Sequence, residues 1–91
     1  MINYTVKLSA KAAKDLEMIS KTIRRTKPVA FAELEKHILG LENMPEKYPF
    51  YEEDPWIKRG IRYMKCGTFG VFFGMNKETK KVFVIRVLVM M

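Results

Sequence analysis

The sequence predicts an α+β fold in which two helices pack on one face of a four-stranded sheet. Three observations predict it. Apolar residues alternate with polar ones at the N-terminus, they then recur at helical spacing, and three aromatic and β-branched segments follow Gly60. The order is therefore an N-terminal strand, a two-helix hairpin and a three-stranded antiparallel meander. The length of 91 residues allows one domain, spanning residues 1–91.

The first strand leads directly into the first helix. Alternation predicts a strand with one buried face, and its apolar members are Ile2, Tyr4, Val6 and Leu8. Ser9 follows, and its hydroxyl can accept a hydrogen bond from a free N–H group at a helix N-terminus. We therefore expect a helix to begin after Ser9 and to run to about Arg24 or Arg25.

Both helices of the hairpin are amphipathic. Helical spacing places four apolar residues of the first helix on one face, namely Ala12, Leu16, Ile19 and Ile23. Pro28 suits the first turn of the second helix, where its missing N–H group costs nothing, and Pro45 is expected to end that helix. The apolar face of the second helix consists of Phe31, Leu34, Ile38 and Leu41.

Residues 45–57 form an acidic, proline-rich loop. They contain three of the four prolines and carry four acidic side chains against one basic side chain. Such a composition predicts irregular structure, which we expect to wrap closely over the domain. Trp56 is expected to seal an edge of the core rather than to bind a ligand.

The remaining residues form the meander. Three segments rich in aromatic and β-branched residues predict strands, and they are Ile61–Cys66, Phe69–Met75 and Val82–Val89. Gly67 and Thr68 make the short turn between the first two strands, and residues 76–80 make a polar turn before the third. Short turns between successive strands favour antiparallel pairing.

Positive charge gathers in the C-terminal third. The formal net charge is +7, and residues 58–91 carry eight basic side chains and one acidic side chain. This cluster indicates a polyanionic partner, either nucleic acid or an acidic protein segment, but a basic face that only aids solubility fits the composition too. The single cysteine, Cys66, can form neither an internal disulfide nor a cysteine-based zinc site, so no metal or cofactor is expected. The absence of a membrane-spanning run and of a secretory signal predicts a cytoplasmic protein.

Most catalytic motifs are missing from the sequence. It contains no G-x-S-x-G motif, no phosphate-binding glycine loop and no H-E-x-x-H motif. The only histidine, His37, follows Glu33 by one helical turn, so a surface pair explains it. Cys66 ends a predicted strand and is expected to be a small buried apolar residue rather than a nucleophile.

The basic residues remain as candidates for function. Five of them surround the predicted C-terminal strands as candidates for RNA binding, namely Lys58, Arg59, Arg62, Lys65 and Arg86. An arginine in an apolar strand is costly to bury unpaired, so Arg62 and Arg86 are expected on the sheet face that the helices leave open. Together they could bind a phosphate and stabilise a phosphodiester transition state, which makes them candidate catalytic residues. Alternatively, each arginine pairs with an acidic residue of the loop, Glu52, Glu53 or Asp54.

A set of residues in a fixed order carries a family resemblance. It consists of Tyr4–Ser9 with Ala12, Asp15 and Leu16, then Ile38, Leu39, Leu41, Pro45, Tyr48–Pro49, Gly60–Arg62, Lys65–Phe69, Val71–Phe73 and Val84–Leu88. Together they resemble the RelE/ParE superfamily of toxins from bacterial type II toxin–antitoxin systems over nearly the whole chain. The resemblance implies a compact α+β toxin that a cognate acidic antitoxin wraps and neutralises.

The resemblance implies two different activities. RelE-like members cleave mRNA on the ribosome with basic residues and without a metal, whereas ParE-like members inhibit DNA gyrase and are not nucleases. The basic residues favour mRNA cleavage as the leading activity, with Arg62 and Arg86 as its catalytic residues. A non-enzymatic gyrase inhibitor and an inactive antitoxin-binding protein are the alternatives.

Two departures from the nuclease branch weaken that leading activity. Nuclease members usually have an arginine directly after the aromatic residue that begins the third strand, where this chain has Gly70 after Phe69. The nuclease branch also continues into a tail that supplies catalytic side chains. This sequence instead reads Leu88-Val89-Met90-Met91 and has no basic residue after Arg86. We therefore expect nuclease activity to be weak or lost.

Overall fold

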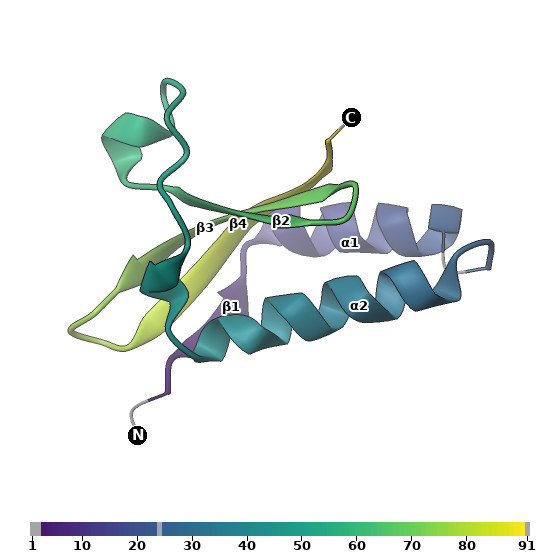
Figure 1. The fold of residues 1–91 in the computed structure, drawn as a ribbon, viewed down its shortest axis with the longest axis horizontal. Helices are drawn as coiled ribbons and strands as arrows, with labels where there is room; N and C mark the ends of the chain where they lie inside the picture. The colour runs from purple at the N-terminus through teal and green to yellow at the C-terminus, as the bar shows by residue number, and fades with distance from the viewer. Residues whose placement is uncertain (1–2, 24, 91) are drawn as a thin grey trace.

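The structure, a computed structural model, describes residues 3–23 and 25–90. Two helices pack against one face of a four-stranded sheet (Figure 1). The strand order is β1-β4-β3-β2, with β1 parallel to β4 and the other pairs antiparallel. The elements are β1 (Thr5–Leu8), α1 (Ala10–Ile23), α2 (Pro28–Leu39), β2 (Arg62–Cys66), β3 (Phe69–Asn76) and β4 (Lys81–Val89). The predicted α+β architecture is confirmed.

Ser9 joins the sheet to the first helix. Its hydroxyl accepts a hydrogen bond from the N–H group of Ala12 at 3.0 Å, which confirms the predicted cap of α1. The same hydroxyl donates to the carbonyl oxygen of Ile85 in β4 at 2.9 Å. Ser9 therefore fixes the direction of α1 relative to the central strand of the sheet. Ile2, the predicted start of β1, lies outside the described residues.

The second helix ends earlier than the sequence predicts. The described part of α1 extends to Ile23 and Arg25 lies in a turn, whereas Arg24 lies outside the described residues. The second helix begins at Pro28 as expected but stops at Leu39, well before Pro45. Residues 40–42 tighten into a 3-10 helix that begins at a glycine, a poor helix former. Leu41 still reaches the core from this turn and is fully buried.

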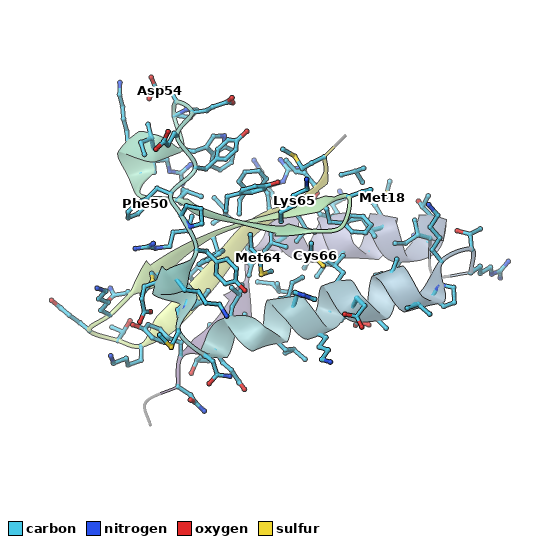
Figure 2. All side chains as sticks on the ribbon, in the orientation of Figure 1. Met18, Phe50, Asp54, Met64, Lys65 and Cys66 are labelled. Atoms are coloured by element: carbon cyan, nitrogen blue, oxygen red, sulfur yellow. The ribbon has the colours of Figure 1, made fainter. Side chains whose placement is uncertain are left out.

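The hydrophobic core lies between the helices and the sheet. The helices contribute Ala12, Ile19, Phe31, Leu34 and Ile38, and the facing strands contribute Met64, Cys66, Phe69, Val71, Phe73, Val82, Val84 and Val87. Figure 2 shows Met64 and Cys66 on the side of β2 that faces α2, with Lys65 on the other side. The predicted apolar faces of both helices are therefore confirmed.

A bulge in β4 changes which face its residues occupy. Phe73 pairs with Val84, but the preceding Phe72 pairs with Arg86, so Ile85 is an extra residue in β4. One extra residue reverses the alternation of side chains along the rest of the strand. As a result Val84 and Val87 both face the core, and Arg86 lies opposite Phe72 on the other face of the sheet.

The loop of residues 45–57 covers the outer edge of β2. The N–H group of Tyr51 donates to the carbonyl oxygen of Ile61 at 2.9 Å, and that of Tyr63 donates to the carbonyl oxygen of Pro49 at 3.0 Å. Phe50 forms an isolated bridge with Arg62. The loop thus pairs with a strand edge that would otherwise expose its backbone groups. Within the described ranges, no helix is long and apolar enough to cross a membrane.

Candidate functional site

The sheet face that points away from the helices carries an aromatic cluster, which consists of Tyr51, Trp56, Tyr63 and Phe72. Trp56 stacks on Phe72 with ring centroids 5.4 Å apart and an interplanar angle of 26°. Phe72 is only 2% exposed, although it lies on the side of the sheet away from the main core. The face that we expected to be open is therefore partly closed by the loop, and Trp56 seals this second, smaller core.

Arg62 is tied to the loop before β2. Its Nη1 donates to the carbonyl oxygens of Tyr48 at 2.6 Å and Glu46 at 3.1 Å. Its guanidinium lies 4.1 Å from the ring centre of Phe50. Arg62 is paired across the sheet with Phe73, whose side chain is in the main core. Arg62 therefore lies on the helix side of the sheet, and its hydrogen bonds attach the loop to β2.

Arg86 is tied to α1 instead. Its Nε and Nη2 donate to the two carboxylate oxygens of Asp15 at 2.7 and 3.1 Å. The backbone N–H group of Val87 donates to the same carboxylate at 3.0 Å. Partial burial raises the pKa of Asp15, but the bonds from Arg86 and Val87 and the charges of Arg86 and Lys11 outweigh it and leave that pKa below its ordinary value. The hydrogen bond that Arg86 donates to Asp15 in turn raises the pKa of Arg86.

The structure separates the two candidate catalytic arginines. Arg62 and Arg86 lie on opposite faces of the sheet, so the prediction that they share one open face is wrong. Strict alternation along β4 would place Arg86 on the face of Val82 and Val84, and the bulge at Ile85 reverses this. Neither arginine pairs with a loop carboxylate, since their partners are the loop carbonyls and Asp15.

Basic residues do meet at another place, a hollow of about 330 Å³. Its charged lining is Lys11 from α1, Arg59 from the short 3-10 helix Ile57–Arg59, and Arg86 from β4, with Trp56 as an aromatic wall. Of the five candidate RNA-binding residues, only Arg59 and Arg86 line it. Sequence reasoning missed Lys11, because nothing in the helical spacing shows that the start of α1 meets the end of the acidic loop.

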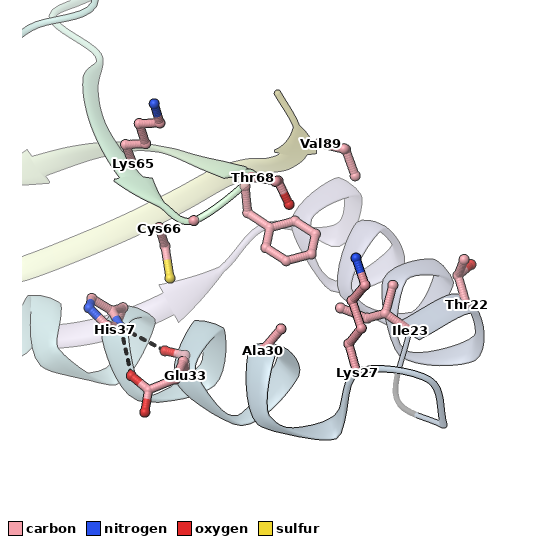
Figure 3. A pocket seen from close by; sticks show the side chains of 12 residues that line it. Thr22, Ile23, Lys27, Ala30, Glu33, His37, Lys65, Cys66, Thr68 and Val89 are labelled. Atoms are coloured by element: carbon pink, nitrogen blue, oxygen red, sulfur yellow. Dashed lines mark hydrogen bonds and ion pairs between the residues drawn. The ribbon is translucent and has the colours of Figure 1, made fainter. Parts of the chain in front are cut away.

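A larger groove of about 810 Å³ opens on the helix side (Figure 3). It lies between the end of α1, one side of α2 and the β2–β3 turn, and its apolar lining includes Ile23, Ala30, Phe69 and Val89. Lys27, Glu33, His37 and Lys65 also line it. The sequence did not reveal this groove, since its walls come from segments far apart in the chain.

The groove offers no activated nucleophile or base. His37 Nδ1 donates to the backbone oxygen of Glu33 at 2.7 Å and lies 3.9 Å from its carboxylate, which is the predicted surface pair. Burial, together with the negative charge of Glu33, raises the pKa of the Cys66 thiol. A thiol held protonated in this way is a poor nucleophile. The mostly apolar lining of the groove is suited to binding an apolar surface.

Gly70 lies on the sheet face that points away from the helices, where the side chains of Tyr63 and Met90 cover it. A Cβ atom added to it would lie 2.7 Å from Tyr63 Cε1 and 2.8 Å from Met90 Cγ. The position where the nuclease branch has an arginine is therefore already covered by the Tyr63 ring and the Met90 side chain. An arginine could not leave the strand here unless both of these side chains moved.

Comparison with known proteins finds one matching sequence family and several solved structures with a similar fold. The ParE toxin family of type II toxin–antitoxin systems (parDE) matches residues 6–89. A chain of the chromosomal ParDE system from P. aeruginosa has a TM-score of 0.75 at 16% identity, covering 100% of both chains. A chain of the RelBE2 toxin–antitoxin complex from Mycobacterium tuberculosis has a TM-score of 0.74 at 19% identity, covering 97% of this chain and 99% of that one.

An archaeal relative has the same fold. A chain of the RelE–RelB complex from Pyrococcus horikoshii has a TM-score of 0.66 at 17% identity, covering 96% of this chain and 94% of that one. No curated protein sequence matches the chain significantly.

Proposed function

Because the chain belongs to the ParE toxin family of type II toxin–antitoxin systems, we propose that it inhibits DNA gyrase by binding rather than by catalysis. A cognate acidic antitoxin neutralises it. The family match extends over residues 6–89 and favours this activity over the mRNA cleavage that the basic residues had suggested.

Gly70 is the observation that carries the proposal. Nuclease members usually have an arginine at this position, and here Tyr63 and Met90 cover the glycine within 3 Å of where a side chain would begin. The two remaining candidate arginines are engaged elsewhere, Arg62 by loop carbonyls and Arg86 by Asp15. Transition-state stabilisation needs charged groups that converge on one point, and Arg62 and Arg86 occupy opposite faces of the sheet.

A supercoiling assay tests this activity. Purified protein added to DNA gyrase, relaxed plasmid and ATP is expected to inhibit supercoiling in proportion to the protein bound. Supercoiling that continues unchanged at high protein concentration would contradict the proposal. Primer extension on mRNA from induced cells provides the comparison, because ribosome-dependent cleavage gives codon-phased ends and gyrase inhibition gives none.

A growth assay tests the remaining alternative, an inactive antitoxin-binding protein. Cells that express the protein alone are expected to stop growing. Normal growth together with tight antitoxin binding would identify an inactive antitoxin-binding protein instead.

We further propose that the antitoxin occupies the apolar groove between the helices and the β2–β3 turn. The three solved structures above come from toxin–antitoxin systems. The groove presents Ile23, Ala30 and Val89 at its surface, and Lys27 and Lys65 also line it. An amphipathic segment with acidic flanks would match both the apolar floor and these cations.

Two substitutions on the same helix test the location. Ala30→Glu places a charge inside the groove, whereas Ala32→Glu places the same charge on the exposed side of α2, outside it. Co-purification with the cognate antitoxin is expected to be lost with Ala30→Glu and kept with Ala32→Glu. If both variants keep the complex, the antitoxin binds elsewhere.

A further inference from the structure

Three cationic side chains converge on the hollow next to Trp56. Lys11 comes from the first turn of α1, Arg59 from the short 3-10 helix that follows the acidic loop, and Arg86 from the central strand β4. None of the described residues that line the hollow is acidic, and the first turn of α1 contains no acidic residue. The volume of about 330 Å³ suits a small anionic group rather than a folded protein element.

Arg86 is held in position for such a group. Asp15 accepts bonds from its Nε and Nη2 atoms, so one edge of the guanidinium is fixed. The Nη1 atom takes no part in that bidentate pair, and the side chain is 34% exposed. A planar guanidinium with a free edge is well matched to the oxygens of a phosphate. Asp15 neutralises one charge, and the hollow still has two cations in excess, from Lys11 and Arg59.

We infer that this hollow binds the phosphate of a nucleotide unit, with Lys11, Arg59 and Arg86 contacting the phosphate oxygens. A phosphate offers oxygens in several directions, which three cations on separate elements can reach together, whereas a carboxylate is satisfied by a single guanidinium. Trp56 adds an aromatic surface at the same wall, and aromatic side chains bind nucleobases by stacking. The phosphate belongs either to a nucleic-acid strand or to a free nucleotide. The inference does not depend on gyrase inhibition.

Trp56 makes the binding measurable, because it is the only tryptophan in the chain and it lines the hollow. Titration with inorganic phosphate or AMP is expected to change its emission and to saturate. A labelled single-stranded oligonucleotide, followed by anisotropy, is expected to bind and to be displaced by phosphate. An oligonucleotide that binds more tightly than AMP would indicate a nucleic-acid strand, whereas equal affinity would indicate a free nucleotide.

Two double variants with the same change in charge separate a site from a diffuse basic surface. Lys11→Gln with Arg59→Gln removes two cations of the hollow, and Lys14→Gln with Lys58→Gln removes two exposed neighbours that do not line it. The first pair is expected to weaken phosphate binding at least about tenfold, since each lost charged hydrogen bond contributes strongly. The second pair is expected to weaken it by no more than about twofold.

Three results would overturn the inference. One is the absence of saturable binding of phosphate, AMP and oligonucleotide to the folded wild-type protein. Another is an equal loss of affinity in both double variants, which would reveal only general attraction to a basic surface. The third is an acidic peptide that displaces phosphate and binds more tightly than every phosphate probe. The substituted side chains are exposed, so we expect each variant to fold. Thermal unfolding of each variant checks this.

Discussion

Asp15 links α1 to two adjacent residues of β4 through one carboxylate. It bonds to the Arg86 guanidinium and to the backbone of Val87, and it lies on α1. Its side chain is 17% exposed, so solvent screens the pair only partly. The bulge at Ile85 brings Arg86 and the Val87 N–H group to the same carboxylate, which a regular strand with alternating faces would not do.

Acid should therefore weaken the fold through Asp15. A carboxyl group whose pKa is lowered on folding stabilises the folded state above its ordinary pKa of 3.8 and loses that contribution as pH falls through the lowered value. Asp15→Asn is expected to lower the free energy of unfolding by about 2–3 kcal/mol at neutral pH, because it leaves Arg86 without its ionic partner. Urea unfolding at several pH values measures this, and the difference from wild type should shrink below pH 3.8.

Glu17→Gln is the matched control for Asp15. Glu17 pairs with Lys21 at 3.3 Å on the exposed side of the same helix. Its loss is expected to change stability by less than about 0.5 kcal/mol. A destabilisation by Asp15→Asn that is equally large at low and neutral pH would contradict the ionic explanation.

Gly70 is required by packing rather than by backbone conformation. Gly70→Ala is expected to cost about 1–3 kcal/mol of unfolding free energy, because the new Cβ overlaps the Tyr63 ring and Met90. Gly74→Ala in the same strand is the control, since its Cβ would lie 3.6 Å from Ile61 Cδ1, an ordinary contact. Thermal unfolding should separate the two variants, and equal melting temperatures would argue against the crowding at Gly70.

The aromatic cluster acts as a second core that attaches the acidic loop to the sheet. Phe72 contacts Tyr51, Trp56 and Tyr63, with ring centroids 5.0–5.4 Å apart. Phe72→Ala is expected to cost about 3 kcal/mol, close to the cost of removing a phenylalanine from a main core. Chemical denaturation measures the loss, and Trp56 emission in the folded state should shift toward that of an exposed indole.

Phe83→Ala provides the comparison within the sheet. Phe83 is 44% exposed on β4, so its removal should cost less than about 1.5 kcal/mol. If the two phenylalanine variants were equally stable, the cluster around Phe72 would not be holding the loop in place.

The elements were predictable from the sequence because local patterns determine them. The cap at Ser9, the proline at the start of α2 and the apolar helix faces all depend on neighbouring residues. The early end of α2 and the bulge in β4 depend on packing across the molecule, which a local pattern does not contain. The candidate site was the least predictable part of the molecule, because a one-residue bulge places Arg86 on the face opposite Arg62.

The net charge and the apolar groove are expected to contribute differently to antitoxin binding. The net charge is +7, whereas the groove proposed for the antitoxin is lined mainly by apolar atoms. Raising the salt concentration is therefore expected to slow association with the acidic antitoxin and to leave dissociation almost unchanged. Stopped-flow or surface-binding kinetics would measure both rates. A dissociation rate that rises steeply with salt would place the main contacts on the basic surface.

The pairing of β1 with β4 also governs when the protein can become active. Thr5–Leu8 pairs with residues 81–84, so the strand at the beginning of the sequence finds its partner only after all other described elements have been synthesised. β4 also completes the pairing of β3 and carries the acceptor for Ser9. Long-range pairing of this kind delays folding until both segments are free to meet. A nascent chain therefore has no complete sheet until residues 81–84 have emerged and paired with β1.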